Sequence, residues 1–281
     1  MATYKGIKGF KVQSLASDPT ASETIGKVFY NTAGYALKYS AEGGGAWSTG
    51  ETMNTARIYS SGAGDSTATI VAGGGPGDKA DSESYNGDSW TTTNSLTTAR
   101  DQAVGCGSST AALACGGNPG GTGTSLVEQW DGTNWTEIQN FTSARRSANV
   151  VGTTTAALFF GGRPAGGGVS NLTEEWNGTS WVEKGDQVTA QFYSNGAGLS
   201  TSAIKMGGFQ PVTALCETWN GTTWSETTNI PVALGQGTGA GVSNTLAFSI
   251  AGDSPSPATA VVNKWNGTSW TAAPSLATAR T

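Results

Sequence analysis

The 281-residue chain contains no histidine, which restricts the catalytic chemistry that it could perform. Ser-His-Asp and Cys-His catalysis, histidine-ligated zinc or copper, and histidine acid–base chemistry are therefore excluded. Carboxylates remain available for hydrolysis of the glycosidase type. A catalytic pair would have to come from acidic residues that do not recur along the chain, such as Asp65, Asp78, Asp186 or Asp253. Nothing in their spacing brings two of them together, so we expect a protein that is not an enzyme, with no cofactor and no metal site.

The other charged residues recur at regular intervals. Equivalent positions hold Arg57, Arg100, Arg145, Gln191, Leu234 and Arg280, and a second set holds Glu83, Glu128, Glu174, Glu217 and Asn263. Equivalent arginines could form an anion-binding ring. However, the first three copies keep both charges and the fifth has lost both, which favours an ion pair inside each copy. A partly buried ion pair of this kind is usually structural.

Tryptophan defines the period of the repeat. An aromatic residue, a turn and a tryptophan recur as YNGDSW, WDGTNW, WNGTSW, WNGTTW and WNGTSW. Separations of 43 to 46 residues relate the tryptophans Trp47, Trp90, Trp135, Trp181, Trp224 and Trp270. A small-residue segment ending in a glycine pair, such as Gly73-Gly74, follows each arginine position, with Ala251-Gly252 in the fifth copy. A fixed period of this length indicates a repeat architecture.

Each copy is predicted to form four antiparallel strands. The two segments before the glycine pair are rich in Gly, Ala and Val, which suits strands crowded near an axis. Asn-Gly and Asp-Gly before the tryptophan are typical of a hairpin turn, because these residues tolerate positive φ. One four-stranded sheet buries too little surface to be stable alone, so stacking of the copies around a ring predicts a β-propeller.

The repeat also resembles a known family. Thr-Ala-Arg, an apolar segment ending in Gly-Gly, Glu-x-Tyr/Trp and a closing Trp are similar to the kelch repeat. The resemblance covers roughly residues 47–281 and implies an all-β, kelch-like propeller of four-stranded antiparallel blades.

The number of blades depends on the N-terminal segment. Five copies are complete, whereas Trp47 and Arg280 form the two ends of a sixth. Strand candidates at 10–15, 27–30 and 36–39 lead into Trp47. We favour six blades, in which residues 1–46 complete a degenerate closing blade and residues 47–281 supply the other repeats. The alternative is five blades with an N-terminal hairpin module.

The same N-terminal segment carries a second resemblance. GKVFYNT, followed by ALKY and AW, is similar to a short module of bacteriophage tail and fibre proteins, particularly those of marine phages. This resemblance implies a virion structural protein, assembled in the host cytoplasm, that attaches to the host surface. Its expected partners are other virion proteins, further copies of itself, and a host-surface glycan or protein. A purely architectural virion protein and a glycan-processing propeller enzyme remain alternatives.

The segments after the glycine pairs differ most between copies. In a four-stranded meander they lie on the same face as the connections from tryptophan to arginine, and variable loops on a fixed scaffold are where recognition is usually built. The candidate ligand-binding residues on this face are Asp78, Lys79, Arg163, Phe209, Gln210 and Asp253.

Composition excludes some other classes of partner. The net charge is −5, and no cluster of Lys and Arg could follow a phosphate backbone, so we expect no nucleic-acid binding. No apolar run approaches the ~18 residues of a membrane span, so we expect no membrane insertion. The three cysteines, an odd number, are expected to be free thiols.

Overall fold

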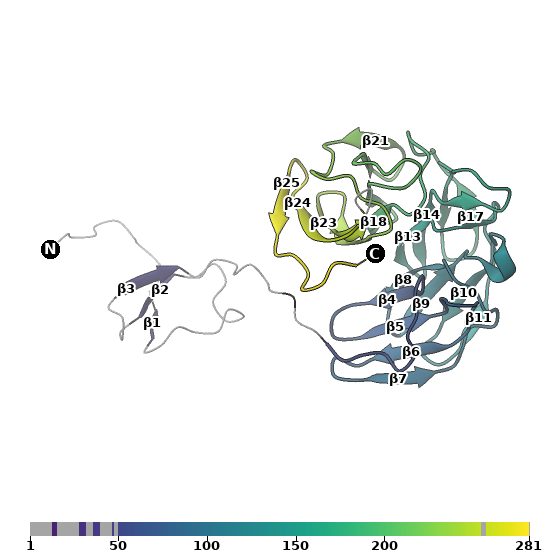
Figure 1. Cartoon of the computed structure of the whole chain (residues 1–281), viewed down its shortest axis with the longest axis horizontal. Helices are drawn as coiled ribbons and strands as arrows, with labels where there is room; N and C mark the ends of the chain where they lie inside the picture. The colour runs from purple at the N-terminus through teal and green to yellow at the C-terminus, as the bar shows by residue number, and fades with distance from the viewer. Residues whose placement is uncertain are drawn as a thin grey trace. The chain divides into compact units, whose positions relative to one another are not determined.

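The computed structural model describes residues 13–15, 28–31, 36–39, 47, 50–253 and 257–280. The chain divides into two compact units, Met1–Trp47 and Ser48–Thr281. Figure 1 labels most of their strands.

The N-terminal unit contains a three-stranded sheet. Its strands are β1 (Gln13–Leu15), β2 (Val28–Asn31) and β3 (Ala36–Tyr39). β1 pairs with β2 in parallel, and β2 pairs with β3 as an antiparallel hairpin. β1 and β3 fall within the predicted segments, and β2 extends one residue beyond its segment, to Asn31. That residues 1–46 complete a closing blade stays a prediction.

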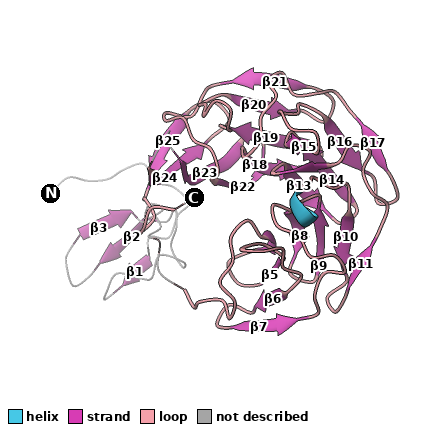
Figure 2. Ribbon diagram, turned by 45° about the vertical axis from the view of Figure 1, so that its right-hand side comes forward, coloured by secondary structure: helices cyan, strands magenta, loops and turns pink. Residues whose placement is uncertain are grey.

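The second unit contains five four-stranded antiparallel sheets, which are the blades (Figure 2). The first is β4 (Ser61–Gly64), β5 (Thr69–Ala72), β6 (Ser82–Tyr85) and β7 (Trp90–Thr93). The second is β8 (Val104–Ser108), β9 (Ala111–Cys115), β10 (Val127–Trp130) and β11 (Trp135–Glu137). The third is β13 (Asn149–Thr153), β14 (Ala156–Phe160), β16 (Thr173–Trp176) and β17 (Trp181–Glu183). The fourth is β18 (Asn195–Leu199), β19 (Ser202–Met206), β20 (Cys216–Trp219) and β21 (Trp224–Thr227). The fifth is β22 (Thr238–Ser243), β23 (Leu246–Asp253), β24 (Ala258–Trp265) and β25 (Trp270–Ala273).

A two-stranded sheet and a single 3₁₀ turn complete the described secondary structure. β12 (Arg145–Arg146) pairs with β15 (Arg163–Pro164), and Pro119–Gly121 forms a single 3₁₀ turn, η1. No helix in the described part of the chain is long and apolar enough to cross a membrane.

The structure has five such blades, which is the lower of the two counts considered from the sequence. The first strands of successive blades pack together, β4 against β8, β8 against β13, β13 against β18, and β18 against β22. β22 and β4 are the first strands of the fifth and first blades. Among the described residues, these two strands pack against each other less than the four successive pairs do. Arg280, one of the two ends assigned to a sixth copy, follows the last strand of the fifth blade. The favoured count of six was drawn from Arg280 and from Trp47, the other end.

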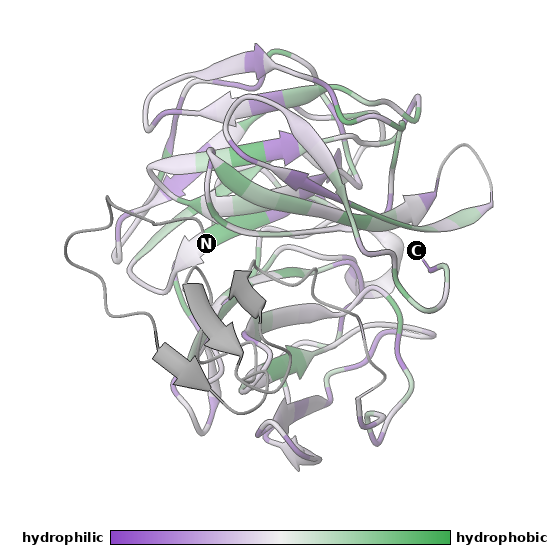
Figure 3. Cartoon of the chain, turned by 90° about the vertical axis from the view of Figure 1, so that its left-hand side faces the viewer, coloured by the Kyte–Doolittle hydropathy of each residue, from purple (hydrophilic) through white to green (hydrophobic). Residues whose placement is uncertain are grey.

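Hydrophobic packing joins neighbouring blades. Each of the four buried apolar clusters draws its members from two successive blades. The closing tryptophans connect the same pairs, because the indole Nε1 of Trp135 donates to Ser82 Oγ at 3.0 Å and that of Trp224 donates to Thr173 Oγ1 at 2.9 Å. Figure 3 shows hydrophobic residues along strands inside the blades. The closing tryptophans of the second to fifth blades therefore pack sheet against sheet, as the repeat predicted, whereas Trp47 is 47% exposed.

The hairpin before each closing tryptophan follows one design. In the second blade, Trp130 pairs with Trp135 across the turn, and their rings lie 5.4 Å apart. Asp131 Oδ1 accepts hydrogen bonds from the backbone N–H groups of Thr133 and Asn134, both at 2.8 Å. Gly132 has a φ of 95°, which glycine adopts without a steric penalty.

Close approach of the backbone explains the small residues of the inner strands. A Cβ added to Gly105 would lie 2.4 Å from Ser61 Oγ in the first blade. A Cβ on Gly239 would lie 2.3 Å from the carbonyl oxygen of Gly196 in the fourth. Larger residues would push these neighbouring blades apart.

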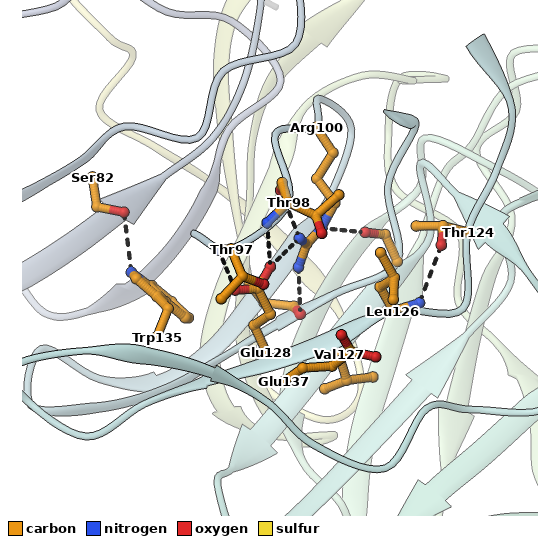
Figure 4. Close-up of polar contacts among 12 residues, drawn as sticks. Ser82, Thr97, Thr98, Arg100, Thr124, Leu126, Val127, Glu128, Trp135 and Glu137 are labelled. Atoms are coloured by element: carbon orange, nitrogen blue, oxygen red, sulfur yellow. Dashed lines mark hydrogen bonds and ion pairs between the residues drawn. The ribbon is translucent and has the colours of Figure 1, made fainter. Parts of the chain in front are cut away.

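The predicted ion pairs form inside the blades and fix the connections between them. Arg57 binds Glu83 at 2.7 Å, Arg145 binds Glu174 at 2.8 Å, and all four side chains are buried. In the second blade the same pair is Arg100 with Glu128, which also accepts the backbone N–H groups of Thr97 and Thr98 (Figure 4). The carboxylates thus hold the connections that lead into the first strands.

The fourth blade replaces the missing arginine from another strand. Gln191 stands at the arginine position, and Lys205 on β19 binds Glu217 Oε1 at 2.6 Å. Glu217 still accepts the backbone N–H groups of Val188 and Thr189 at 2.8 and 2.9 Å. Burial lowers the pKa of the Lys205 ammonium, and Glu217 opposes this shift. The sequence did not predict this pair, because the cation lies outside the repeating position.

Candidate binding site at the centre of the ring

Five residues, one from each blade, surround the centre of the ring where the connections enter the first strands. Each stands two positions after the arginine position. We call them the collar: Tyr59, Gln102, Ser147, Tyr193 and Gln236. Their φ angles lie between 50° and 60°, in the left-handed region. They are five of the seven non-glycine residues with positive φ among the residues described.

The collar is linked from blade to blade through its backbone. The N–H of Gln102 donates to the carbonyl of Tyr59 at 2.8 Å, and that of Ser147 donates to Gln102 at 3.1 Å. Tyr193 donates in turn to Ser147, and Gln236 to Tyr193, both at 2.9 Å. In the second to fifth blades these bonds account for the left-handed conformation, because it turns the collar N–H toward the preceding blade. They also fix the direction of the collar side chains.

The collar lines a cavity of about 730 Å³. The first residues of the inner strands continue its wall, including glycines in four of the blades. Leu276 and Arg280 line it beside the fifth blade, and Arg57 and Ile58 beside the first. The volume falls in the range of ~300–1,000 Å³ that is usual for small-molecule sites.

One set of hydrogen bonds crosses the collar between the second and fourth blades. Gln102 Oε1 accepts from Tyr193 OH at 3.1 Å and from Ser147 Oγ at 2.7 Å. Gln102 Nε2 donates to the carboxylate of Asp101 at 3.2 Å. Burial raises the pKa of the Tyr193 phenol, with a smaller opposing effect of its hydrogen bonding, so the phenol remains a donor at neutral pH.

A matching set joins the first and fifth blades. Tyr59 OH donates to Gln236 Oε1 at 3.4 Å, and Gln236 Nε2 donates to Asp253 Oδ2 at 3.2 Å. The rings of Tyr59 and Tyr193 stack on each other with centroids 5.9 Å apart and planes inclined by 27°. Two phenols from non-adjacent blades therefore meet at the cavity.

The variable loops lie on the face of the collar. Each loop pairs with the residue next to an arginine position, as Ile58 does with Gly75 and Phe192 with Phe209. The expected proximity of the loops and the tryptophan-to-arginine connections is therefore observed.

The structure places the six predicted ligand-binding residues in separate settings. Asp78 accepts a hydrogen bond from the backbone N–H of Gly120 at 2.6 Å, which ties the first loop to the second. The backbone of Lys79 bonds to Gly74 and Arg100. Gln210 is exposed, and Asp253 supports the collar.

Arg163 and Phe209 come together on a buried ring. The guanidinium of Arg163 lies 5.7 Å from the ring centroid of Phe192, and Phe209 meets the same ring edge-on at 5.7 Å. These contacts use both side chains for packing within the protein. Within the described ranges, no hydrogen bond, ion pair or ring contact joins this cluster to Asp78 or Lys79, and ligand binding by the six residues stays a prediction.

The non-repeating carboxylates each have a local partner. Asp65 accepts hydrogen bonds from Thr67 and Ala68 in a turn, and the Thr67 side-chain bond is the largest cause lowering the pKa of this exposed carboxyl. Asp186 accepts from the backbone N–H of Thr173 at 3.3 Å. No described group of three or more Cys, Asp or Glu residues is arranged to hold a metal ion.

Comparison with solved structures supports the architecture. The structure of YjhT, a propeller protein, matches with a TM-score of 0.69 and 12% sequence identity, over 81% of this chain and 86% of that chain. The fold is a β-propeller. At this identity the likeness shows the fold alone. No family model and no curated protein matches the sequence.

Sequence reasoning missed the collar, although a signal was present. The position two residues after the arginine position holds Tyr, Gln, Ser, Tyr and Gln in the five copies, whereas the neighbouring glycines and tryptophans repeat. A variable polar position inside a repeated frame indicates a role other than packing.

Proposed function

We propose that the chain is a non-enzymatic virion protein, a tail or fibre component, whose propeller attaches the particle to a surface glycan or protein of the host. The observation that carries the binding role is the contrast between the repeated frame and the residues at its centre. Ion pairs and tryptophans recur from blade to blade, while the collar and the loops beside it differ. A rigid scaffold that presents variable polar side chains around a cavity is suited to recognition.

The virion assignment rests on the sequence resemblances to phage tail modules and kelch repeats. A particle carries many copies of a tail component, so weak single sites combine into strong adhesion. This mode of binding suits a small site without catalytic groups. Other virion proteins and further copies of the chain are the partners that the proposal requires.

The test is adsorption of the fluorescently labelled full chain, as a multivalent bead conjugate, to a panel of marine bacteria. Binding to a subset of strains, abolished when the loops starting at Gly75, Asn118 and Arg163 are replaced by Gly-Ser segments of equal length, supports attachment. Uniform absence of binding, together with incorporation into particles, would indicate a purely architectural protein. Release of reducing ends from host polysaccharide that is abolished by a single Asp→Asn change would indicate a glycan-processing enzyme.

A further inference from the structure

The collar amides have their orientation fixed by the acidic residues beside them. A carboxylate only accepts hydrogen bonds, so Asp101 and Asp253 hold the NH₂ groups of Gln102 and Gln236 toward themselves. The amide oxygens then accept the phenol protons, as the distances to Tyr193 and Tyr59 indicate. The O–H groups of both phenols therefore donate hydrogen bonds within the protein. Their remaining lone pairs are therefore free to accept hydrogen bonds from a ligand.

The aromatic surface at the collar is accessible. Tyr59 is 42% exposed and the adjacent Ile58 is 55% exposed, although both line the cavity. A phenol ring with an engaged hydroxyl offers an apolar face beside a polar edge. A sugar has the complementary surface, because its C–H groups form a flat apolar face and its hydroxyls surround that face.

The conformation of the collar adds an independent argument. Left-handed backbone is unfavourable for residues with a side chain, and glycine is the residue that avoids this cost. This chain contains 42 glycines, and it uses glycine at many other positions of positive φ. The blade-to-blade backbone bonds could be made by glycine equally well. Retention of Tyr and Gln at these positions points to a role for their side chains.

A buried polar atom in the cavity wall also lacks a partner. Asn195 is 1% exposed and donates from Nδ2 to Ser249 Oγ at 3.1 Å, while its Oδ1 has no hydrogen bond among the described residues. Asn195 belongs to the lining of the cavity. A buried acceptor of this kind is satisfied when a ligand hydroxyl or a water reaches it.

We propose that the cavity mouth is a binding site for a neutral saccharide. Its sugar ring stacks on Tyr59, and its hydroxyls donate to the phenol oxygens and to Asn195. Asp101 and Asp253, which accept from the collar amides, offset the positive charge of Arg280 in the cavity lining, and Arg57 is paired with Glu83. We therefore expect a neutral sugar rather than an acidic one. The proposal rests on the attachment function, because it names the ligand class that the attached surface would display.

The test is saturation-transfer NMR and calorimetric titration of the full chain with methyl hexosides, neutral oligosaccharides and glucuronate. Transfer to a neutral sugar is expected, and Tyr59→Ala should weaken its binding by about tenfold or more. Gln102→Ala should weaken binding as well, because it releases Tyr193. Tyr85→Ala is the matched control, since this aromatic packs against Trp90 at a tilted angle in an outer hairpin and should leave sugar binding unchanged.

Several outcomes would overturn the site. These are no signal with any neutral sugar, binding of glucuronate alone, or unchanged affinity in Tyr59→Ala and Gln102→Ala with a native circular dichroism spectrum. Sugar binding without adsorption to cells would refute attachment and leave the site standing. Adsorption that is insensitive to Tyr59→Ala and to free sugar would refute the site and leave attachment standing.

Discussion

Removal of the cation in the fourth blade should destabilise the protein strongly. Lys205→Met leaves the Glu217 carboxylate buried, with only the backbone N–H groups of Val188 and Thr189 as partners. Loss of one member of a buried ion pair costs about 3–5 kcal/mol in the free energy of unfolding. At ~2–4 °C per kcal/mol for a domain of this size, Tm should fall by roughly 6–20 °C.

The other blades supply matched variants for this experiment. Gln191→Arg in the Lys205→Met background places arginine where three blades carry it, so it should recover most of the lost stability. Lys205→Ser with Glu217→Asn copies the fifth blade, where Ser249 and Asn263 occupy these positions, and should cost less than Lys205→Met alone.

Urea denaturation followed by tryptophan fluorescence measures each variant. The control is Lys184→Met, because Lys184 pairs with Glu175 on the surface and its loss should cost only ~0–1 kcal/mol. Equal midpoints for wild type and Lys205→Met, or failure of Gln191→Arg to restore the midpoint, would refute the assignment of this pair as a substitute for the repeated bridge.

Three further results are expected. Burial opposes ionisation of Glu83, but hydrogen bonds from Arg57 and the backbone hold its pKa below the ordinary 4.5. The stability that this carboxylate contributes is therefore present above pH 4.5 and is lost as the pH falls through the lowered pKa. Glu83→Gln should flatten the acid side of a curve of unfolding free energy against pH, and an unchanged curve would contradict this. Burial raises the pKa of Cys106 to about 12 and that of Cys216 to about 11, so both thiols should react with Ellman's reagent only in denaturant, whereas rapid labelling of the native protein would disprove their burial. Gly116→Ala should cost clearly more stability in urea denaturation than Gly120→Ala. Both glycines have a φ near 65°, but only a Cβ at Gly116 would lie 2.5 Å from a carbonyl oxygen, that of Arg145. Equal losses would show that this contact relaxes freely.

The fold could be predicted because the packing signals recur. Trp135 and its equivalents bury an indole between sheets, and a residue with that task appears once per copy at constant phase. The Asn-Gly hairpins and the Arg57–Glu83 type of pair also lie within one copy, so comparison of copies reveals them. The number of blades was harder to predict. Trp47 and Arg280 stand at the positions expected for a further copy of the repeat, and these positions alone do not show whether the segments form a blade.

The site could be predicted only in part. The loops carry Arg163 and Phe209, which variation between copies suggested as ligand-binding residues. Their shared contact with Phe192 depends on the tertiary fold, so the loop sequences alone could not predict it. Lys205 replaces an arginine from a different strand, which no alignment of the copies places there. Tyr59 and Tyr193 belong to different blades, and their meeting depends on the geometry of the ring rather than on spacing in the chain.

The most direct test of the central claim is a crystal structure of the chain soaked with the neutral oligosaccharide that binds best in solution. We expect a sugar ring stacked on Tyr59 inside the cavity, with hydroxyls near the Tyr193 phenol and Asn195. A sugar bound only to the outer strands or between lattice neighbours, with the collar empty, would contradict it.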